Sequence, residues 1–157
     1  MSHLVLFVCT GNVCRSPMAE ALFNAQAQQS GESHQYIAQS AGTWALDNQP
    51  ASTFAITSMG KRHLDLSCHR GRTITRAMLE AAAVVIVMTK NHAEALRSEF
   101  PAYRKKLHLM SELQSATFDI GDPYGGTLEE YESCAQHLEK LIEVGYSKIK
   151  AWISNSN

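Results

Sequence analysis

The 157-residue sequence lacks the patterns that identify several common classes of protein. No apolar run approaches the ~20 residues that a membrane-spanning helix needs. The apolar run at residues 4–9 is too short for the core of a signal peptide, and no basic segment precedes it, so we expect a cytoplasmic protein. The net charge of −1 provides no broad basic face, which argues against nucleic acid or an anionic membrane as a partner.

Few residues are arranged for binding a metal or a nucleotide. The seven histidines include no pair spaced by four residues, and no cysteine–histidine spacing is typical of zinc. The glycines form neither the G-x-G-x-x-G pattern nor a phosphate-binding G-x4-G-K-S/T loop. We therefore expect no metal and no cofactor. The four cysteines show no disulfide-framework spacing, and in a reducing compartment a cysteine in a polar loop is more often catalytic or redox-active than structural.

What the sequence does contain is a regular alternation of apolar runs and helix-like segments. The apolar runs that predict strands are residues 4–8, 36–41, 84–88 and 106–110. The segments that predict helices are residues 17–30, 50–62, 75–82, 90–100 and 128–152. This order predicts an α/β fold, a single three-layer domain over residues 1–157, with a four-stranded parallel sheet and helices on both faces. Ligands of such sheets bind outside the carboxyl ends of the strands.

The loop after the first predicted strand contains the most informative residues. Cys9 ends the strand, Arg15 follows six positions later, and Ser16-Pro17 opens the first helix, with Ser16 as the expected N-cap. A helix N-terminus presents unpaired N–H groups and the positive end of the dipole, and a cysteine held there tends to be a thiolate. The arginine adds a planar fork that fits two phosphate oxygens. This Cys-x5-Arg loop therefore predicts an oxyanion site with a nucleophilic sulfur.

The five residues between Cys9 and Arg15 allow the backbone to wrap a tetrahedral anion with its N–H groups pointing inward. We expect Gly11 to supply an unusual backbone dihedral and Asn12 a left-handed one. The residues expected to surround the phosphate in this way are Thr10, Gly11, Asn12, Val13 and Cys14.

The segment VCTGNVCRSPMAEALF (residues 8–23) resembles the start of the low-molecular-weight protein tyrosine phosphatases. Their signature is C-x5-R-S after the first strand, and their catalytic acid lies in a late D-P-Y segment, which is residues 122–124 here. The segments SAGT at 40–43 and VVIVMTK at 84–90 are also similar, so the resemblance covers essentially the whole chain. It implies that Cys9 attacks phosphorus, Arg15 holds the phosphate, and Asp122 is first general acid and then general base.

The resemblance also implies supporting roles around the loop. Ser16 would hydrogen-bond the nucleophile, while Asn12, Ser40 and His69 would fix the strained loop. Cys14 would trap an oxidised Cys9 as a reversible disulfide, because the family often has a cysteine here.

Further resemblance-based expectations concern the surroundings of the loop. Trp44 and Tyr124 would form two walls of a slot for a flat aryl group. By contrast, we expect Cys68 and Cys134 to be buried and inert.

The expected activity is hydrolysis of phosphotyrosine on a protein through a phosphocysteine, with inorganic phosphate as product. The nearest alternative is a protein-arginine phosphatase, a similar bacterial branch in which a polar threonine replaces Val13 and phenylalanine tends to replace Tyr124. In this chain Val13 and Tyr124 favour phosphotyrosine, whereas Gly125-Gly126 and the M-T-x-x-H run at 88–92 favour phosphoarginine. An arsenate reductase would need relay cysteines, of which only Cys68 lies in a suitable region. A cysteine phosphoryl carrier would lack the arginine.

Overall fold

The protein, described by a computed structural model over residues 2–156, is built on one four-stranded parallel sheet. The strands lie in the order β2-β1-β3-β4, which confirms the predicted sheet. Their bounds are β1 (His3–Cys9), β2 (Tyr36–Gly42), β3 (Val84–Val87) and β4 (Leu107–Leu109). Strand β1 is central: it pairs with β2 from His3↔Tyr36 to Cys9↔Gly42, and with β3 from Val5↔Val84 to Val8↔Val87.

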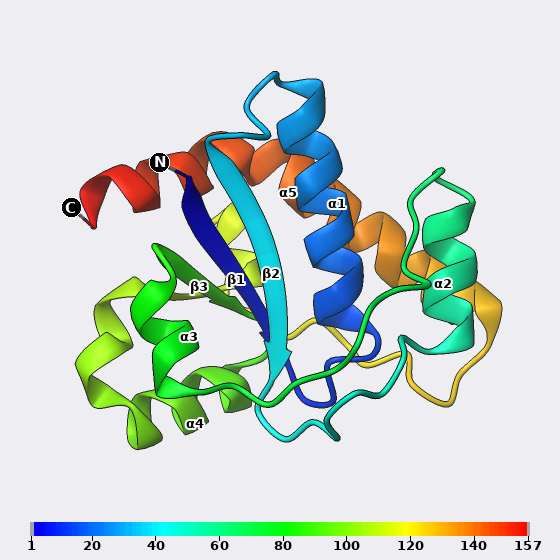
Figure 1. Ribbon diagram of the computed structural model, residues 1–157, viewed down its shortest axis with the longest axis horizontal. Coiled ribbons are helices and arrows are strands. Elements are labelled where there is room, and N and C mark those ends of the chain that lie inside the picture. The colour runs from blue at the N-terminus through cyan, green and yellow to red at the C-terminus, as the bar shows by residue number, and fades with distance from the viewer. Residues whose placement is uncertain (1, 157) are drawn as a thin grey trace.

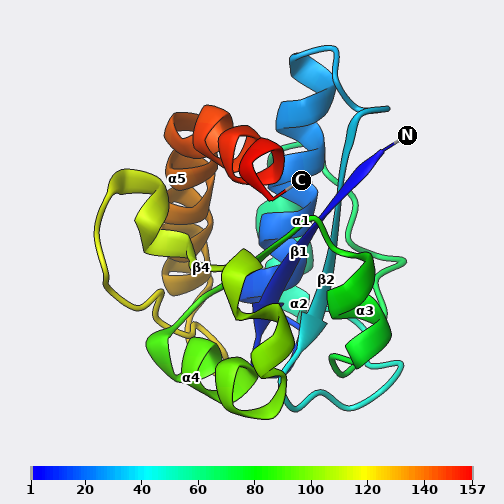
Figure 2. The ribbon, with the colours of Figure 1, turned by 90° about the vertical axis from the view of Figure 1, so that its left-hand side faces the viewer.

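Helices cover both faces of this sheet, as predicted (Figures 1 and 2). One face carries α1 (Arg15–Gln29), α2 (Thr53–Gly60) and α5 (Leu128–Asn155). The other carries α3 (Arg76–Ala81) and α4 (Lys90–Glu99). Short 3₁₀ helices at Pro101–Lys106 and Met110–Gln114 flank β4, and neither was predicted from the sequence.

The side chains of β1 explain why its sequence is a continuous apolar run. Val5 and Phe7 enter the core under α1 and α5, while Leu6 and Val8 enter the core under α3 and α4. All four are fully buried, as expected of a strand with helices on both sides. Because β1 is held from both faces, its last residue, Cys9, has a fixed position.

Threonines cap three of the helices. Thr75, Thr89 and Thr127 each accept a hydrogen bond from the backbone N–H three residues on, at the starts of α3, α4 and α5. The return bond from Glu130 to the Thr127 N–H, which a full capping box needs, is missing from the hydrogen bonds of residues 2–156.

Two predicted helix starts are wrong. Helix α1 begins at Arg15 with Cys14 as its N-cap, so Ser16 lies inside the first turn, where its hydroxyl contacts Cys9 and Asn12 instead of capping the helix. Helix α2 begins at Thr53 and not at residue 50, since Ser52 before it has an extended backbone. The predicted end of α1 is close: Ser30 is its C-cap, and Gly31 follows with a φ of 71°.

The strand order creates a crevice at the carboxyl end of β1. Strand β1 leads into α1 on one face, whereas β3 leads into α4 on the opposite face, so the connections diverge between these two neighbouring strands. Across the described chain, no helix combines the length and the apolar character needed to cross a membrane.

Candidate active site

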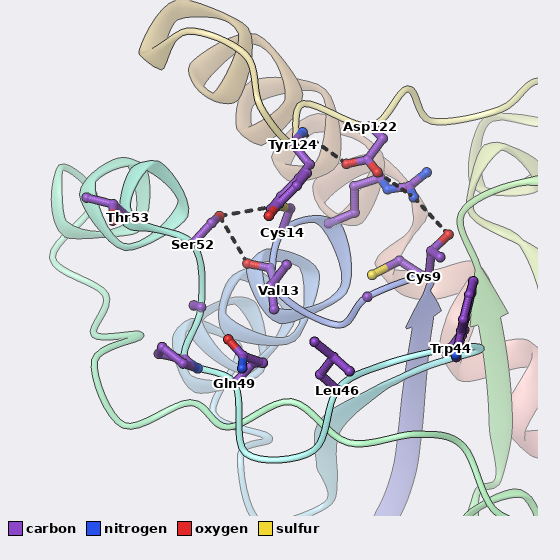
Figure 3. Close-up of a pocket in the computed structure, with 15 residues that line it drawn as sticks. Cys9, Val13, Cys14, Trp44, Leu46, Gln49, Ser52, Thr53, Asp122 and Tyr124 are labelled. Carbon is purple, nitrogen blue, oxygen red and sulfur yellow. Dashed lines mark hydrogen bonds and ion pairs between the residues drawn. The ribbon is translucent and has the colours of Figure 1, made fainter.

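A pocket of about 560 Å³ opens outside the carboxyl end of β1 (Figure 3). Three segments line it: the loop at residues 9–15, the segment 44–53 after β2, and residues 122–124 before α5. We call the turn formed by residues 9–16 the floor, and the residues of 44–53 and 122–124 that line the pocket the rim. The sequence-predicted nucleophile, arginine and carboxylate therefore reach the same pocket from two distant parts of the chain.

Cys9 lies at the centre of the floor. Its sulfur is 2.9 Å from the Ser16 hydroxyl oxygen, and that oxygen accepts a hydrogen bond of 2.8 Å from the Asn12 side-chain amide. Cys9 Sγ is a nearer partner for the Ser16 hydroxyl hydrogen than the Ala41 carbonyl oxygen, which lies 3.4 Å away. This arrangement suits a sulfur that carries negative charge, because the hydroxyl can donate to it.

Asn12 holds the floor together. Its φ of 58° is the left-handed value predicted for it, and its side chain is fully buried. The amide also donates to Ser40 Oγ at 3.0 Å, the amide oxygen accepts from the Arg72 N–H at 3.0 Å, and its backbone oxygen lies 2.7 Å from His69 Nε2. Asn12, Ser16, Ser40 and His69 are therefore close together.

Gly11 has no positive φ, and the left-handed residue of the loop is Asn12, as predicted. An asparagine tolerates this conformation, and its side chain makes hydrogen bonds that a glycine could not make. Gly11 still lines the pocket.

Arg15 is only 4% exposed, and its guanidinium is held on two sides. Nη1 donates to the Ile120 carbonyl at 2.9 Å, while Nη2 lies 3.4 Å from Asp122 Oδ2 and 3.5 Å from Thr10 Oγ1. Nε is buried and has no hydrogen-bond partner in the part of the chain that the structure describes. A buried guanidinium N–H without a partner is costly, so this atom suits an oxygen of an anion bound in the pocket.

Asp122 lies at the exposed rim, where its Oδ1 accepts a hydrogen bond from the Tyr124 N–H at 3.1 Å. Asp119, the other aspartate of this loop, accepts from the Lys90 N–H at the start of α4 and is not among the residues that line the pocket. Trp44 and Tyr124 both line it, and their side chains are 82% and 69% exposed.

The cysteines differ in environment, and all four, which lie within residues 2–156, carry free thiols. Burial raises the pKa of Cys14, whose sulfur lies 3.2 Å from both Ser52 Oγ and Tyr131 OH. Burial likewise raises the pKa of Cys134 to about 12, which agrees with an inert thiol, although Cys134 is only partly buried. The expectation for Cys68 is wrong: it lies in an exposed turn outside the sheet.

Sequence reasoning missed two titratable residues beside the site. His92 Nε2 lies 2.7 Å from Thr10 Oγ1, and Glu20 accepts a hydrogen bond of 2.6 Å from the Ser40 hydroxyl. Burial lowers the pKa of His92 to about 4, with a smaller contribution from Arg15, whereas burial raises the pKa of Glu20. Two features of the sequence could have indicated them. For His92 it is the N-cap spacing of residues 89–92 directly after an apolar strand, and for Glu20 it is a position one helical turn after Ser16.

Over residues 2–156, no group of three or more histidine, cysteine, aspartate or glutamate side chains is placed to hold a metal ion. The charge available to an anion in the pocket comes from Arg15, from the floor amides and from the N-terminus of α1.

Comparisons with known proteins agree with this fold and identify a family. Residues 4–152 match the family described as Low molecular weight phosphotyrosine protein phosphatase. A protein-arginine-phosphatase of Bacillus subtilis is 36% identical, over 88% of this chain and 91% of its own. The probable low molecular weight protein-tyrosine-phosphatase EpsP of Ralstonia nicotianae is 32% identical, over 96% of this chain and 99% of its own. The crystal structure of a YwlE mutant from Bacillus subtilis superposes with a TM-score of 0.90 at 34% identity, covering 95% of this chain and 99% of that one.

Proposed function

The chain belongs to the low molecular weight phosphotyrosine protein phosphatase family, and we propose that it hydrolyses protein phosphotyrosine through a phosphocysteine on Cys9. The observation that carries this proposal is the buried Arg15 fork, whose Nε has no partner within residues 2–156, in the same pocket as the Cys9 sulfur. A phosphate dianion would satisfy that N–H and the floor amides together.

In the first proposed step the Cys9 thiolate attacks phosphorus and the bond to the tyrosine oxygen breaks. Asp122, in its protonated form, gives its proton to the leaving oxygen, so tyrosine departs as a neutral phenol. Arg15 and the floor amides hold the non-bridging oxygens as charge redistributes. The hydroxyl of Ser16 stabilises the sulfur whenever it carries negative charge.

In the second step water hydrolyses the phosphocysteine. Asp122, now a carboxylate, takes a proton from the water as its oxygen attacks phosphorus, and the thiolate of Cys9 leaves. Inorganic phosphate is released and both residues return to their starting states. The cycle needs no cofactor, and phosphate and vanadate should inhibit competitively.

The pocket walls favour an aryl ester. Val13 offers only methyl groups, and Trp44 and Tyr124 offer ring faces that can pack against a phenyl ring. A phosphoarginine side chain keeps polar N–H groups that need acceptors. Asp122 is the only acidic residue among those that line the pocket, so the walls suit these groups less well than a phenyl ring.

Phosphoarginine is the second candidate substrate, because the relative from Bacillus subtilis is named a protein-arginine-phosphatase at 36% identity. Arsenate reduction has less support, since Cys68 is exposed and is not among the residues that line the pocket. Turnover of matched phosphotyrosine and phosphoarginine peptides separates the first two. A preference for the arginine peptide would refute the first choice.

The intermediate itself can be tested with p-nitrophenyl phosphate at mildly acidic pH. We expect the wild type to turn over, Cys9→Ser to be inactive, and Asp122→Asn to accumulate a phosphocysteine detectable by mass spectrometry after rapid quenching. A stable phosphocysteine on the wild type, without turnover, would favour a phosphoryl carrier instead.

Cys14 has a further proposed role under oxidation, in the reducing cytoplasm where we place the protein. Peroxide would convert the Cys9 thiolate to a sulfenic acid, and the Cys14 thiol would condense with it to a disulfide and water. We expect a Cys9–Cys14 cross-linked peptide and full recovery of activity with thiol. Irreversible loss of activity, equal in wild type and Cys14→Ser, would contradict this role.

A further inference from the structure

A hydrogen bond between Thr10 and His92 joins the segments that follow the carboxyl ends of β1 and β3. Thr10 directly follows β1, and His92 lies in the first turn of α4, which follows β3. The two side chains meet at 2.7 Å, although 82 positions separate them in the sequence. His92 is 6% exposed and does not line the pocket, so its contact with the site runs through Thr10.

The surroundings of the imidazole determine which nitrogen carries the hydrogen. The backbone N–H of Thr89 donates to His92 Nδ1 at 3.2 Å, so Nδ1 must be an acceptor. Burial, assisted by Arg15 and opposed by Asp119 and Asp122, lowers the pKa of the imidazole to about 4, so the ring is neutral near pH 7. A neutral ring that accepts at Nδ1 carries its hydrogen on Nε2, and it therefore donates to Thr10 Oγ1.

The direction of this bond defines what the Thr10 hydroxyl can do. A hydroxyl has two acceptor positions and one hydrogen. Thr10 Oγ1 accepts from His92 Nε2 at 2.7 Å and faces Arg15 Nη2 at 3.5 Å, so only its hydrogen remains to be donated. Thr10 is exposed at the pocket, where that hydrogen can reach an oxygen of a bound ligand.

We propose that His92 is a positioning residue for phosphoryl transfer: acting through Thr10, it fixes the threonine hydroxyl as a hydrogen-bond donor to an oxygen of the bound phosphoryl group. The inference rests on the proposed roles of Cys9 and Arg15. If a hydrogen-bond acceptor replaced the Nε2–H group of His92, the Thr10 hydroxyl would donate its hydrogen to that acceptor. The oxygen lone pairs of Thr10 would then face the phosphate and repel it.

The effect should appear mainly in turnover, because charge on the phosphoryl oxygens is redistributed in the transition state. A hydrogen bond from a neutral donor to a charged acceptor contributes enough that its loss should lower kcat on the order of 10-fold. The KM for a small aryl phosphate should change by less than about 3-fold, since Arg15 and the floor amides still bind the ground state.

Two substitutions of His92 separate its contacts. In His92→Asn the amide oxygen can still accept from the Thr89 N–H, but the side chain is too short to reach Thr10. In His92→Gln the amide can reach Thr10 and donate, while the bond to Thr89 is lost. Thr10→Val removes the hydroxyl at nearly constant shape, and the double variant Thr10→Val/His92→Asn completes a cycle.

We expect His92→Asn and Thr10→Val each to lower kcat for p-nitrophenyl phosphate about 10-fold, and the double variant to lose no more than the worse single variant. His92→Gln should recover most of the loss despite a lower Tm. Additive losses in the double variant, or a loss in His92→Gln as large as that in His92→Asn, would overturn the proposal.

A cap variant controls for stability. Thr75 caps α3 as Thr89 caps α4 and is not among the residues that line the pocket, so Thr75→Val should lower the Tm and leave kcat unchanged. Wild-type kcat in His92→Asn would refute the role of His92 while leaving the phosphatase proposal intact. An inactive wild type would instead refute the proposed function.

Discussion

The floor and the rim of the pocket are built in opposite ways. In the floor, Asn12, Arg15 and Ser16 are almost completely buried, and their side chains bond to one another or to neighbouring loops. At the rim, Trp44, Leu46 and Tyr124 are 82%, 70% and 69% exposed. Under the proposed function, the groups that hold the phosphate belong to a network of buried hydrogen bonds, whereas recognition of the leaving group falls to exposed side chains with few contacts.

This contrast has a physical origin. The floor must hold N–H groups and a sulfur in place before the substrate arrives, because catalysis by charge stabilisation depends on preorganised groups. The rim contributes mainly apolar area, which is non-directional and tolerates change. Substitutions should therefore be costly in the floor and, apart from those of the proposed acid Asp122, mild at the rim.

The largest expected effect separates two arginines. Arg15→Lys should lower kcat/KM for p-nitrophenyl phosphate by about 10³-fold, because an ammonium group cannot reproduce the planar fork that faces Ile120, Thr10 and Asp122. Arg70→Lys, at an exposed position, should stay within about 2-fold of wild type. Steady-state kinetics on both variants checks this, and a loss below 10-fold in Arg15→Lys would show that the floor does not depend on the fork.

The next effect compares two left-handed asparagines. Asn12 has a φ of 58° in the floor and Asn48 a φ of 67° in an exposed turn between rim residues, so alanine is strained at both. Asn12→Ala also loses the bonds to Ser16, Ser40 and Arg72, and should cost about 2–4 kcal/mol of unfolding free energy, against about 1 kcal/mol for Asn48→Ala. Urea denaturation measures both, and equal losses would mean that backbone strain alone explains the cost.

A smaller effect is expected at the rim. Trp44→Ala and Tyr124→Ala should each lower kcat/KM about 5-fold for an aryl phosphate, because a ring face is lost from the leaving-group side of the pocket. Inhibition by inorganic phosphate, which we expect to bind in the floor alone, should not change. If phosphate affinity falls as much as kcat/KM, then the rim supports the floor and the two regions are not separable.

The sheet and the floor of the pocket could be predicted from the sequence more fully than the grouping of the site residues. The apolar run of β1 and the Cys-x5-Arg spacing predict the sheet and the floor, because both depend on local chemistry. Grouping Cys9, Arg15 and Asp122 in one pocket needed the resemblance as well, since nothing local to residues 9–15 specifies a partner more than 100 positions away.

The errors also have local causes. Ser16 has the pattern of an N-cap, but tertiary hydrogen bonds to Cys9 and Asn12 redirect its hydroxyl. Gly11 was expected to take an unusual dihedral, yet its φ is not positive, and the left-handed residue of the loop is Asn12, as predicted, which also gains side-chain bonds there. His92 was missed because its partner, Thr10, comes from a different strand end, and only the sheet order brings them together.

The smallest expected effect tests whether His92 belongs with the floor. In the unfolded chain an imidazole titrates near its ordinary pKa of 6.5, whereas burial holds the folded pKa of His92 at about 4. Between these values the unfolded state binds more protons, so the contribution of His92 to stability is complete above pH 6.5 and is lost as the pH falls to 4. Because solvent partly screens the site, we expect a loss on the order of 1 kcal/mol.

The variant His92→Gln has no titrating group at this position, so it serves as the control. Burial raises the pKa of Glu20, which has the opposite effect on stability. Subtracting the urea-unfolding free energies of His92→Gln from those of wild type cancels this effect of Glu20. A wild-type advantage that shrinks from pH 7 to pH 4.5 would place His92 in the network of buried hydrogen bonds. A constant difference would show an imidazole open to solvent, like the side chains of the rim.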